Sequence, residues 1–382
     1  MASPPRGRWR GWALAASLAW LLPLLASLLV ARENAFRRRL KPFFAPLPSP
    51  ALSHERCGGE ALSVGLISDL HYAERANRWW WENPGGWGMR RFYRNSLRVL
   101  EDAAEAWRAA NVTDVFVLGD SVDASSGKGA EGSSREAFAR VLARLEGFRV
   151  HFALGNHDLE ALTPRAHLLR LAGIQSETGL ADNDPGGEAA YYAVRMEGIK
   201  WIVLDSYHVS TYWPRTHANY AEARAMLSRH REHFSRPERD PNLKGSGQLR
   251  GPARRFVSLG GALGAPQRRW LARELRDSGG RGEAVAVVTH VPISPGVVSK
   301  ECGAMCLLWD YEEVLDILNT HSTTVLAVFT GHDHPGGYFY DDDDDDDAFS
   351  DSEEFAIDLV DDGDPLIAPR TIDNFWWYNQ RI

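Results

Sequence analysis

The segment Ala153-Leu154-Gly155-Asn156-His157-Asp158 contains a pattern that is repeated along the rest of the chain. An apolar run from Phe148 to Leu154 predicts a short buried strand, and an amide, an imidazole and a carboxylate follow it. Four further segments have the same form, an apolar run followed by metal-binding side chains: Val64 to His71, Val115 to Asp120, Ala284 to His290, and Val325 to His334. Polar side chains at so many strand ends predict one shared polar site.

The length and composition are those of an ordinary globular protein. The chain has 382 residues, of which 44% are hydrophobic and 25% charged, and its formal net charge is −8. Residues 1–44 hold eight Lys/Arg against one acidic residue, whereas residues 341–382 hold fifteen Asp/Glu against two Arg. The body between them is nearly neutral, which argues against a nucleic-acid partner, because such a surface needs a clustered basic face.

The amino-terminal segment, residues 1–44, predicts anchoring or targeting. Residues 11–30 carry no charge, are long enough to span a bilayer as a helix, and have basic residues on both sides. We expect a single-pass membrane anchor, with organelle or secretory targeting and cleavage as the alternatives. The basic residues on both flanks leave the orientation open. Three prolines between residues 43 and 50 indicate a linker over residues 45–61.

Periodicity indicates alternating strands and helices over the body of the chain, residues 62–340. Apolar residues at helical spacing predict helices over residues 90–107, 134–146, 266–276 and 310–318. Residues 191–194 and 200–204 are expected to form a hairpin, and the polar residues 208–255 an insertion or lid. Seven consecutive aspartates, residues 341–347, begin an acidic carboxyl-terminal tail over residues 341–382, and such a like-charge block predicts disorder.

The cysteines Cys57, Cys302 and Cys306 are too few for a disulfide framework. Cys302 and Cys306 pair if the chain enters an oxidising compartment, and are otherwise reduced thiols in a loop. Zinc binding by these two alone is not expected, because a structural zinc site takes four ligands.

The polar residues at the strand ends form a mixed set of nitrogen and oxygen donors. The members of the set are Asp69, His71, Asp120, Asn156, His290, His332 and His334. Such donors suit manganese, iron, zinc or magnesium. They exceed what one ion takes, but they suit two ions that share a bridging carboxylate, an arrangement that clamps a phosphate and activates water. The carboxyl ends of strands are also where open α/β sheets bind ligands.

Five blocks of the sequence, in this order, resemble those of the calcineurin-like metallophosphoesterases: Asp69-x-His71, Gly119-Asp120-x-x-Asp123, Gly155-Asn156-His157-Asp158, His290 and Gly331-His332-x-His334. The resemblance implies an α/β fold of two packed β-sheets flanked by helices. It implies that one metal ion is held by Asp69, His71, Asp120 and His334, and the other by Asp120, Asn156, His290 and His332. It also implies that His157 contacts the scissile phosphate or protonates the leaving group, and that Asp123 orients His157.

Longer strings resemble a subgroup, the manganese-dependent ADP-ribose/CDP-alcohol diphosphatases. These strings are residues 90–97, 260–264, 306–311 and 336–338. The resemblance implies manganese as the cofactor, Arg91 as a ligand of the substrate phosphate, and Leu249 and Cys306 as neighbours of the nucleobase. It implies hydrolysis of the phosphoanhydride bond of ADP-ribose or CDP-alcohols to a nucleoside monophosphate and a phosphorylated sugar or alcohol.

Two other functions fit the same residues. One is a membrane-anchored phosphodiesterase or phosphomonoesterase of other specificity, and the other is a non-catalytic binding module. The binding module is disfavoured, because all the metal-ligand positions and His157 carry the required side chains. The expected partner is a small-molecule nucleotide, and the oligomeric state stays open.

Overall fold

The computed structural model describes most of the chain between residues 63 and 379. The described residues are 63–76, 78–80, 89–127, 133–174, 188–196, 198–230, 249–337, 339, 370–372 and 375–379. For residues 78–80, 89–90, 370–372 and 375–379, only the backbone is described. All of these residues belong to one compact unit, Gly59–Ile382.

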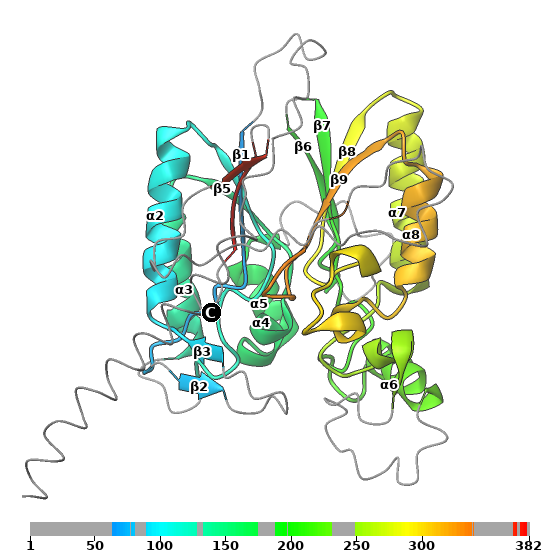
Figure 1. Cartoon of the computed structure of the whole chain (residues 1–382), viewed down its shortest axis with the longest axis horizontal. Helices are drawn as coiled ribbons and strands as arrows, with labels where there is room; N and C mark the ends of the chain where they lie inside the picture. Colours follow the sequence, from blue (N-terminus) through cyan, green and yellow to red (C-terminus); the bar gives the residue numbers. More distant parts are fainter. Residues whose placement is uncertain are drawn as a thin grey trace, which may run out of the picture. The chain divides into compact units, whose positions relative to one another are not determined.

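Two β-sheets form the centre of this unit (Figure 1). The larger has the strand order β10-β11-β1-β4-β5 and the smaller has the order β6-β7-β8-β9. The strands are β1 (Val64–Ser68), β4 (Asp114–Val117), β5 (Arg149–Phe152), β6 (Tyr192–Met196), β7 (Ile199–Val203), β8 (Ala284–Val288), β9 (Val325–Phe329), β10 (Arg370–Ile372) and β11 (Phe375–Asn379). β10 and β6 are antiparallel to their neighbours, and the other pairs are parallel. Parallel pairing brings the carboxyl ends of the strands, and the polar residues after them, to one edge.

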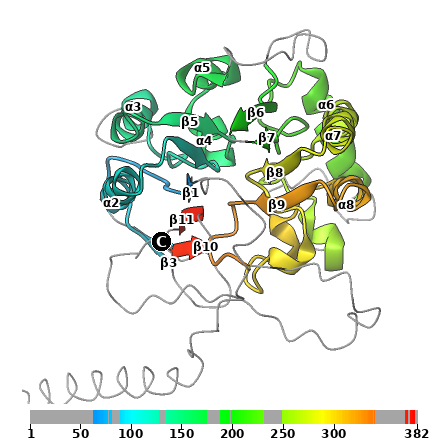
Figure 2. The same ribbon diagram turned by 90° about the horizontal axis from the view of Figure 1, so that it is seen from above.

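Helices cover the outer faces of the sheets (Figures 1 and 2). α2 and α3 lie on the side of the larger sheet, and α7 and α8 lie on the side of the smaller. The helices are α2 (Asn95–Ala109), α3 (Ser134–Arg144), α4 (Asn156–Ala161), α5 (Arg165–Leu171), α6 (Ala218–Arg229), α7 (Gly264–Gly279) and α8 (Tyr311–Thr320), with the 3-10 helices η5 (Gly251–Arg255), η6 (Pro295–Val297) and η7 (Gly303–Cys306). α2 buries an apolar stripe that includes Leu100 and Trp107, and a capping box between Ser133 and Glu136 starts α3.

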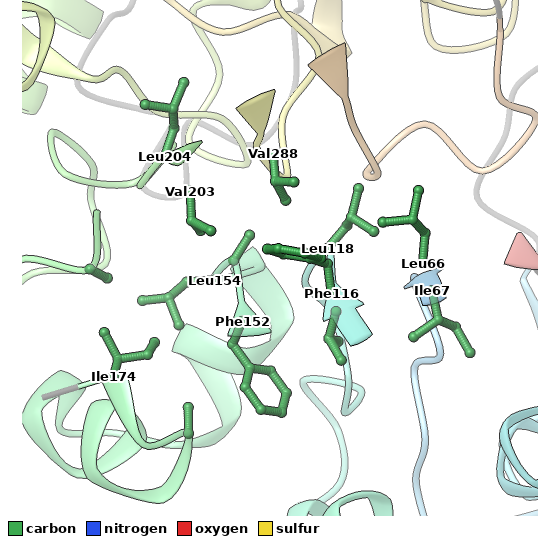
Figure 3. Packing of buried hydrophobic residues seen from close by; sticks show 14 of the residues in the cluster. Leu66, Ile67, Phe116, Leu118, Phe152, Leu154, Ile174, Val203, Leu204 and Val288 are labelled. Atoms are coloured by element: carbon green, nitrogen blue, oxygen red, sulfur yellow. The ribbon is translucent and has the colours of Figure 1, made fainter. Parts of the chain in front are cut away.

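The main hydrophobic core lies between the two sheets. In Figure 3, Phe116 of the larger sheet and Leu154, in the loop after β5, lie opposite Val203 and Val288 of the smaller sheet. All four side chains are buried, and the ring of Phe116 stacks on Trp201 of β7 with centroids 4.5 Å apart. This packing fixes the two sheets against each other, so it also fixes the relative positions of their carboxyl edges.

The structure confirms the expected α/β arrangement of two packed sheets flanked by helices. The predicted hairpin is β6–β7, and the four predicted helices are α2, α3, α7 and α8. α2 begins at Asn95 and not at residue 90, because Met89–Arg91 forms β3, which pairs with β2 (Arg78–Trp80). The expected insertion over residues 208–255 contains α6 and η5, and its residues 231–248 lie outside the described residues.

Two strands come from the region that the charge pattern assigned to an acidic tail. β11 pairs in parallel with β1, with Val64 opposite Phe375 and Ser68 opposite Asn379, and β10 pairs with β11. The larger sheet therefore continues beyond the expected boundary at residue 340. The physical reason is the run Phe375–Asn379, whose aromatic residues favour strands. The aspartates at residues 341–347 lie outside the described residues.

In the part of the chain that the structure describes, no helix is both long enough and apolar enough to cross a membrane. The expected anchor in residues 1–44 and the expected linker in residues 45–61 both lie outside that part. They stay predictions.

Candidate di-metal active site

The expected metal ligands follow strands of both sheets. Asp69 and His71 follow β1, Asp120 follows β4, Asn156 begins α4 after β5, His290 follows β8, and His332 and His334 follow β9. Backbone hydrogen bonds join the loops that carry them. The amides of Asp69 and His71 donate to the carbonyls of Gly119 and Asp120 at 3.1 and 2.8 Å, and the Gly331 amide donates to the His290 carbonyl at 2.9 Å.

Four of these residues have a left-handed backbone. The φ angles of Asp69, His71, Asp120 and His332 are 54°, 45°, 53° and 69°. Such a conformation costs a non-glycine residue about 1–3 kcal/mol and is concentrated at functional sites. Here the backbone hydrogen bonds between the loops hold it, and the ligand atoms of these residues come within 4.8 Å of other members of the set.

Two glycines allow the loops to approach closely. A Cβ atom on Gly155 would collide with the backbone nitrogen and carboxylate of Asp120, and one on Gly331 would collide with the side chains of Ser68 and Asp69. Each glycine directly precedes a ligand, Asn156 or His332. A steric constraint therefore explains why glycine precedes the ligand in the Gly-Asn and Gly-His pairs of the sequence motifs.

One donor group consists of Asp69, His71 and His334, whose ligand atoms lie within 4.8 Å of one another. The Nε2 atoms of His71 and His334 are 3.0 Å apart, and Asp69 Oδ1 is 3.7 Å and 3.6 Å from them. Asp69 Oδ2 accepts hydrogen bonds from the Ser68 hydroxyl and the His332 amide, so Oδ1 is the oxygen that remains for the group.

A second donor group consists of Asp120, His290 and His332, again within 4.8 Å, and His71 and Asp120 also lie within 4.8 Å of a ring nitrogen of His157. Asp120 Oδ2 lies 3.6 Å from His290 Nε2 and 3.5 Å from His71 Nε2, so this carboxylate stands between the two groups. His290 Nδ1 donates to the Leu118 carbonyl at 2.7 Å, which leaves Nε2 as the ligand atom. The bridging role expected for Asp120 stays a prediction, and this position of its carboxylate supports it.

The donors fit divalent ions. Asp69 Oδ1 and His290 Nε2 are buried, and neither makes a hydrogen bond within the described residues. An unpaired buried polar atom costs about 1–3 kcal/mol, which a bound cation would offset. Asp69, His71 and His334 would hold one ion, His290 and His332 the other, and Asp120 would contact both.

Burial and neighbouring charges set the protonation of the ligands. Burial lowers the pKa of His332 to about 4, with a further contribution from His290, and lowers the pKa of His334 to about 3, with a contribution from His71. Both are therefore neutral near pH 7, as a metal ligand must be. Burial alone would lower the pKa of His290, but the Asp120 carboxylate raises it to about 9. Binding of an ion to His290 must then release a proton.

His157 lies beside the donor groups on the first turn of α4. Its ring packs edge-on against His71 with centroids 4.3 Å apart. Its Nδ1 accepts a hydrogen bond from the Ala124 amide at 3.0 Å and lies 3.4 Å from Asp123 Oδ2. Asp123 is more tightly held by Arg91 Nη1, at 2.6 Å, and by the Ser125 amide, at 2.8 Å. The expected His157–Asp123 contact is present, but the Ala124 amide is the closer partner of the imidazole.

The residues expected to bind substrate are spread more widely. Arg91 is close to the site, because its Nη1 also lies 3.4 Å from His71 Nδ1. Cys306 is buried and forms a disulfide with Cys302. Both sulfur atoms lie within 4.8 Å of a carboxylate oxygen of Asp333, which stands between His332 and His334 in the sequence. Leu249 belongs to a second hydrophobic cluster with Phe256 and Trp309. The roles of Arg91, Leu249 and Cys306 stay predictions.

Sequence reasoning missed three groups that touch the ligands. The Tyr207 hydroxyl donates to Asn156 Oδ1 at 3.1 Å. The Leu118 carbonyl holds His290. Asp158 accepts hydrogen bonds from the amides of Val122 and Gly155, at 3.1 and 3.2 Å, and so ties together two ligand loops. Asp158 could have been found from the Gly-Asn-His-Asp motif, whereas the other two carry no local signal.

Comparison with known proteins agrees with this geometry. The family model for calcineurin-like phosphoesterases matches residues 62–336. This chain belongs to the calcineurin-like phosphoesterase family. As a calcineurin-like phosphoesterase it is a metal-dependent hydrolase, and the expected family, fold and di-metal character are confirmed.

Named relatives of this calcineurin-like phosphoesterase are diphosphatases. A protein of Arabidopsis thaliana called manganese-dependent ADP-ribose/CDP-alcohol diphosphatase is 34% identical over 281 residues, which cover 72% of this chain and 81% of that protein. A protein of the same name from Oryza sativa is 32% identical and covers 72% and 78%. The crystal structure of a dimetal phosphatase from Danio rerio superposes with a TM-score of 0.63 at 29% identity, over 74% of this chain and 84% of that one.

Proposed function

We propose that this phosphoesterase hydrolyses the phosphoanhydride bond of nucleoside diphosphate derivatives, with ADP-ribose and CDP-alcohols as substrates and manganese as the metal. The products are a nucleoside monophosphate and a phosphorylated sugar or alcohol. The observation that carries the proposal is the position of Asp120 between two donor groups, with His157 and Arg91 beside them. The names of the relatives support the choice of substrate and metal.

The residues divide the work as follows. When bound, the two ions polarise the phosphoryl oxygens and lower the pKa of a water nucleophile. The Ala124 amide donates to His157 Nδ1, so a neutral His157 carries its proton on Nε2 and can donate a hydrogen bond to a phosphoryl oxygen, where negative charge develops. The guanidinium of Arg91 is placed by Asp123 and can pair with a substrate phosphate.

A substrate panel tests this function. The full chain is incubated with ADP-ribose, CDP-glycerol, bis-(p-nitrophenyl) phosphate and p-nitrophenyl phosphate, each with manganese, magnesium or zinc. We expect nucleoside monophosphate from the first two, with manganese the most effective. Turnover of the two nitrophenyl esters with both nucleotides inert would instead support a phosphodiesterase or phosphomonoesterase of other specificity. No turnover of any ester or anhydride, with manganese bound, would support a non-catalytic binding module.

We also propose that residues 1–44 attach this enzyme to a membrane as a single-pass anchor. The support is the uncharged run over residues 11–30 with basic residues on both sides. Full-length chain and a chain without residues 1–44 are compared by cell fractionation, together with the mass of the recovered amino terminus. Membrane recovery of the intact full-length chain alone is expected. An amino terminus cleaved after the apolar run would point to organelle or secretory targeting, and soluble full-length chain would contradict the anchor.

A further inference from the structure

Tyr207 reaches from one sheet to a ligand carried by the other. It lies in the loop after β7 and is fully buried. Its hydroxyl donates to Oδ1 of Asn156, which follows β5 of the larger sheet, at 3.1 Å. Its ring also faces His290, with centroids 6.0 Å apart. The hydroxyl is therefore inside the site and contacts the amide oxygen of a ligand position directly.

Tyr207 is itself held firmly. Its amide donates to Asp205 Oδ1 at 3.0 Å, and its carbonyl accepts hydrogen bonds from Ser210 Oγ at 2.9 Å and Trp213 Nε1 at 3.2 Å. Asp205 is paired in turn with the buried Arg165. With its backbone fixed at both ends, the tyrosine presents its hydroxyl in one place.

A fixed donor matters because an asparagine amide has two ends of almost the same shape. Only the oxygen has lone pairs for a cation, and the nitrogen carries two protons. A carbonyl-type oxygen has two lone pairs, so Asn156 Oδ1 can accept from Tyr207 and still bind an ion. Without the hydroxyl, the amide can turn its NH₂ group toward the cation, where it repels.

We propose that Tyr207 is a positioning residue for the ion held by Asp120, Asn156, His290 and His332. Its hydroxyl selects the amide orientation of Asn156 in which the oxygen faces that ion. The inference rests on Asn156 being a ligand. Unchanged manganese affinity in Asn156→Ala would refute that assignment separately from this one.

The test is Tyr207→Phe in the full chain, with bound manganese measured by equilibrium dialysis. Loss of a hydrogen bond to a ligand typically weakens metal binding about 10–100-fold. We expect one of the two manganese sites to lose affinity by that factor. The manganese concentration for half-maximal activity should rise by the same factor, while kcat at saturating manganese returns to within about threefold of wild type. The matched control is Tyr192→Phe, which removes a buried tyrosine hydroxyl that donates to the Phe152 carbonyl at 3.2 Å.

The control separates stability from positioning. Both variants lose one buried hydrogen bond, so both should lose about 0.5–1.5 kcal/mol of unfolding free energy. Only Tyr207→Phe should lose manganese affinity. If both variants bind two manganese ions as tightly as the wild type, the proposal is wrong.

Repeating the substitution of Tyr207 in an Asn156→Asp variant tests whether Tyr207 acts by orienting the amide. In Asn156→Asp the two side-chain oxygens are equivalent, so the orientation of the group no longer matters. Adding Tyr207→Phe to this background should change manganese affinity by less than about twofold, as expected when two sites are coupled and one partner is already altered. An equal loss in the wild-type and Asn156→Asp backgrounds would overturn the role in orientation.

Discussion

The Ala124 amide donates a 3.0 Å hydrogen bond to His157 Nδ1. Because Nδ1 accepts this hydrogen bond, it carries no proton, and neutral His157 therefore carries its proton on Nε2. The Nε2–H group can then donate a hydrogen bond to a phosphoryl oxygen and stabilise the charge that develops there. Asp123 Oδ2 lies farther from the same nitrogen, at 3.4 Å. The nearest partner of Nδ1 is therefore a backbone amide and not the carboxylate.

We expect His157→Ala to lower kcat by about 10²–10³-fold, the usual effect of removing one hydrogen-bond donor to the transition state, and to leave manganese binding in place. His157 is not one of the expected metal ligands, so two ions should still bind. The measurement is kcat for ADP-ribose together with bound manganese per chain, and His167→Ala, on α5, is the control. A variant that keeps wild-type kcat would remove His157 from the mechanism.

Asp120→Asn should abolish manganese binding at both sites, because Asp120 Oδ2 lies 3.5–3.6 Å from a histidine of each donor group. An amide keeps the shape but not the charge that a bridging ligand supplies. The control is Asp114→Asn, which changes another buried aspartate associated with β4, at the opposite end of the strand. Bound manganese should fall from two ions to fewer than one in Asp120→Asn only. Two tightly bound ions in that variant would contradict the bridge.

The main features of the site could be read from the sequence because they are local. Each apolar run and the ligand after it lie within a few residues, so a strand and its polar end are visible together. α2 and α7 were visible for the same reason, through their helical spacing.

The features that could not be predicted from the sequence depend on long-range packing. Tyr207 reaches Asn156 only because the two sheets pack face to face, and the two residues are 51 positions apart. The pairing of β11 with β1 joins residues about 310 positions apart and is masked in the sequence by the acidic run before it. The hydrogen bond from Ala124 depends on where the loop after β4 meets α4, and hydrophobic periodicity does not predict that contact.

Acid should destabilise the protein partly through Asp114. Burial alone would raise the pKa of this carboxyl, but hydrogen bonds from His151, Arg149 and Thr113 hold it well below 3.8. Because the folded pKa is depressed, the stabilisation is complete above the unfolded value near 4 and is lost as pH falls toward the folded value. Asp114→Asn should therefore lower the unfolding free energy by roughly 1–3 kcal/mol at pH 7 and flatten its fall between pH 5 and 2.5. Urea unfolding in EDTA measures this, and parallel pH curves for variant and wild type would contradict it.

The Cys302–Cys306 disulfide should stabilise the loop that supports the histidine ligands after β9. It closes a short loop, with a sequence separation of 4, for which chain entropy gives about 2 kcal/mol. The adjoining Ser299 amide and hydroxyl donate to the Asp333 carboxylate at 2.5 and 2.8 Å, and Asp333 lies between His332 and His334. Loosening the loop should therefore also weaken manganese binding.

We expect Cys302→Ser with Cys306→Ser to lower the unfolding free energy by about 2 kcal/mol. A dithiol reductant should have the same effect on the wild type, because it breaks the same bond. Cys57→Ser is the matched control: it should unfold like the wild type and keep the response to reductant, whereas the double variant should not respond to it. The measurement is the urea midpoint with and without reductant, alongside a count of free thiols and of bound manganese. A wild-type midpoint that does not move once both thiols are free would show that the disulfide contributes nothing to stability, and unchanged manganese affinity would separate the loop from the ligands.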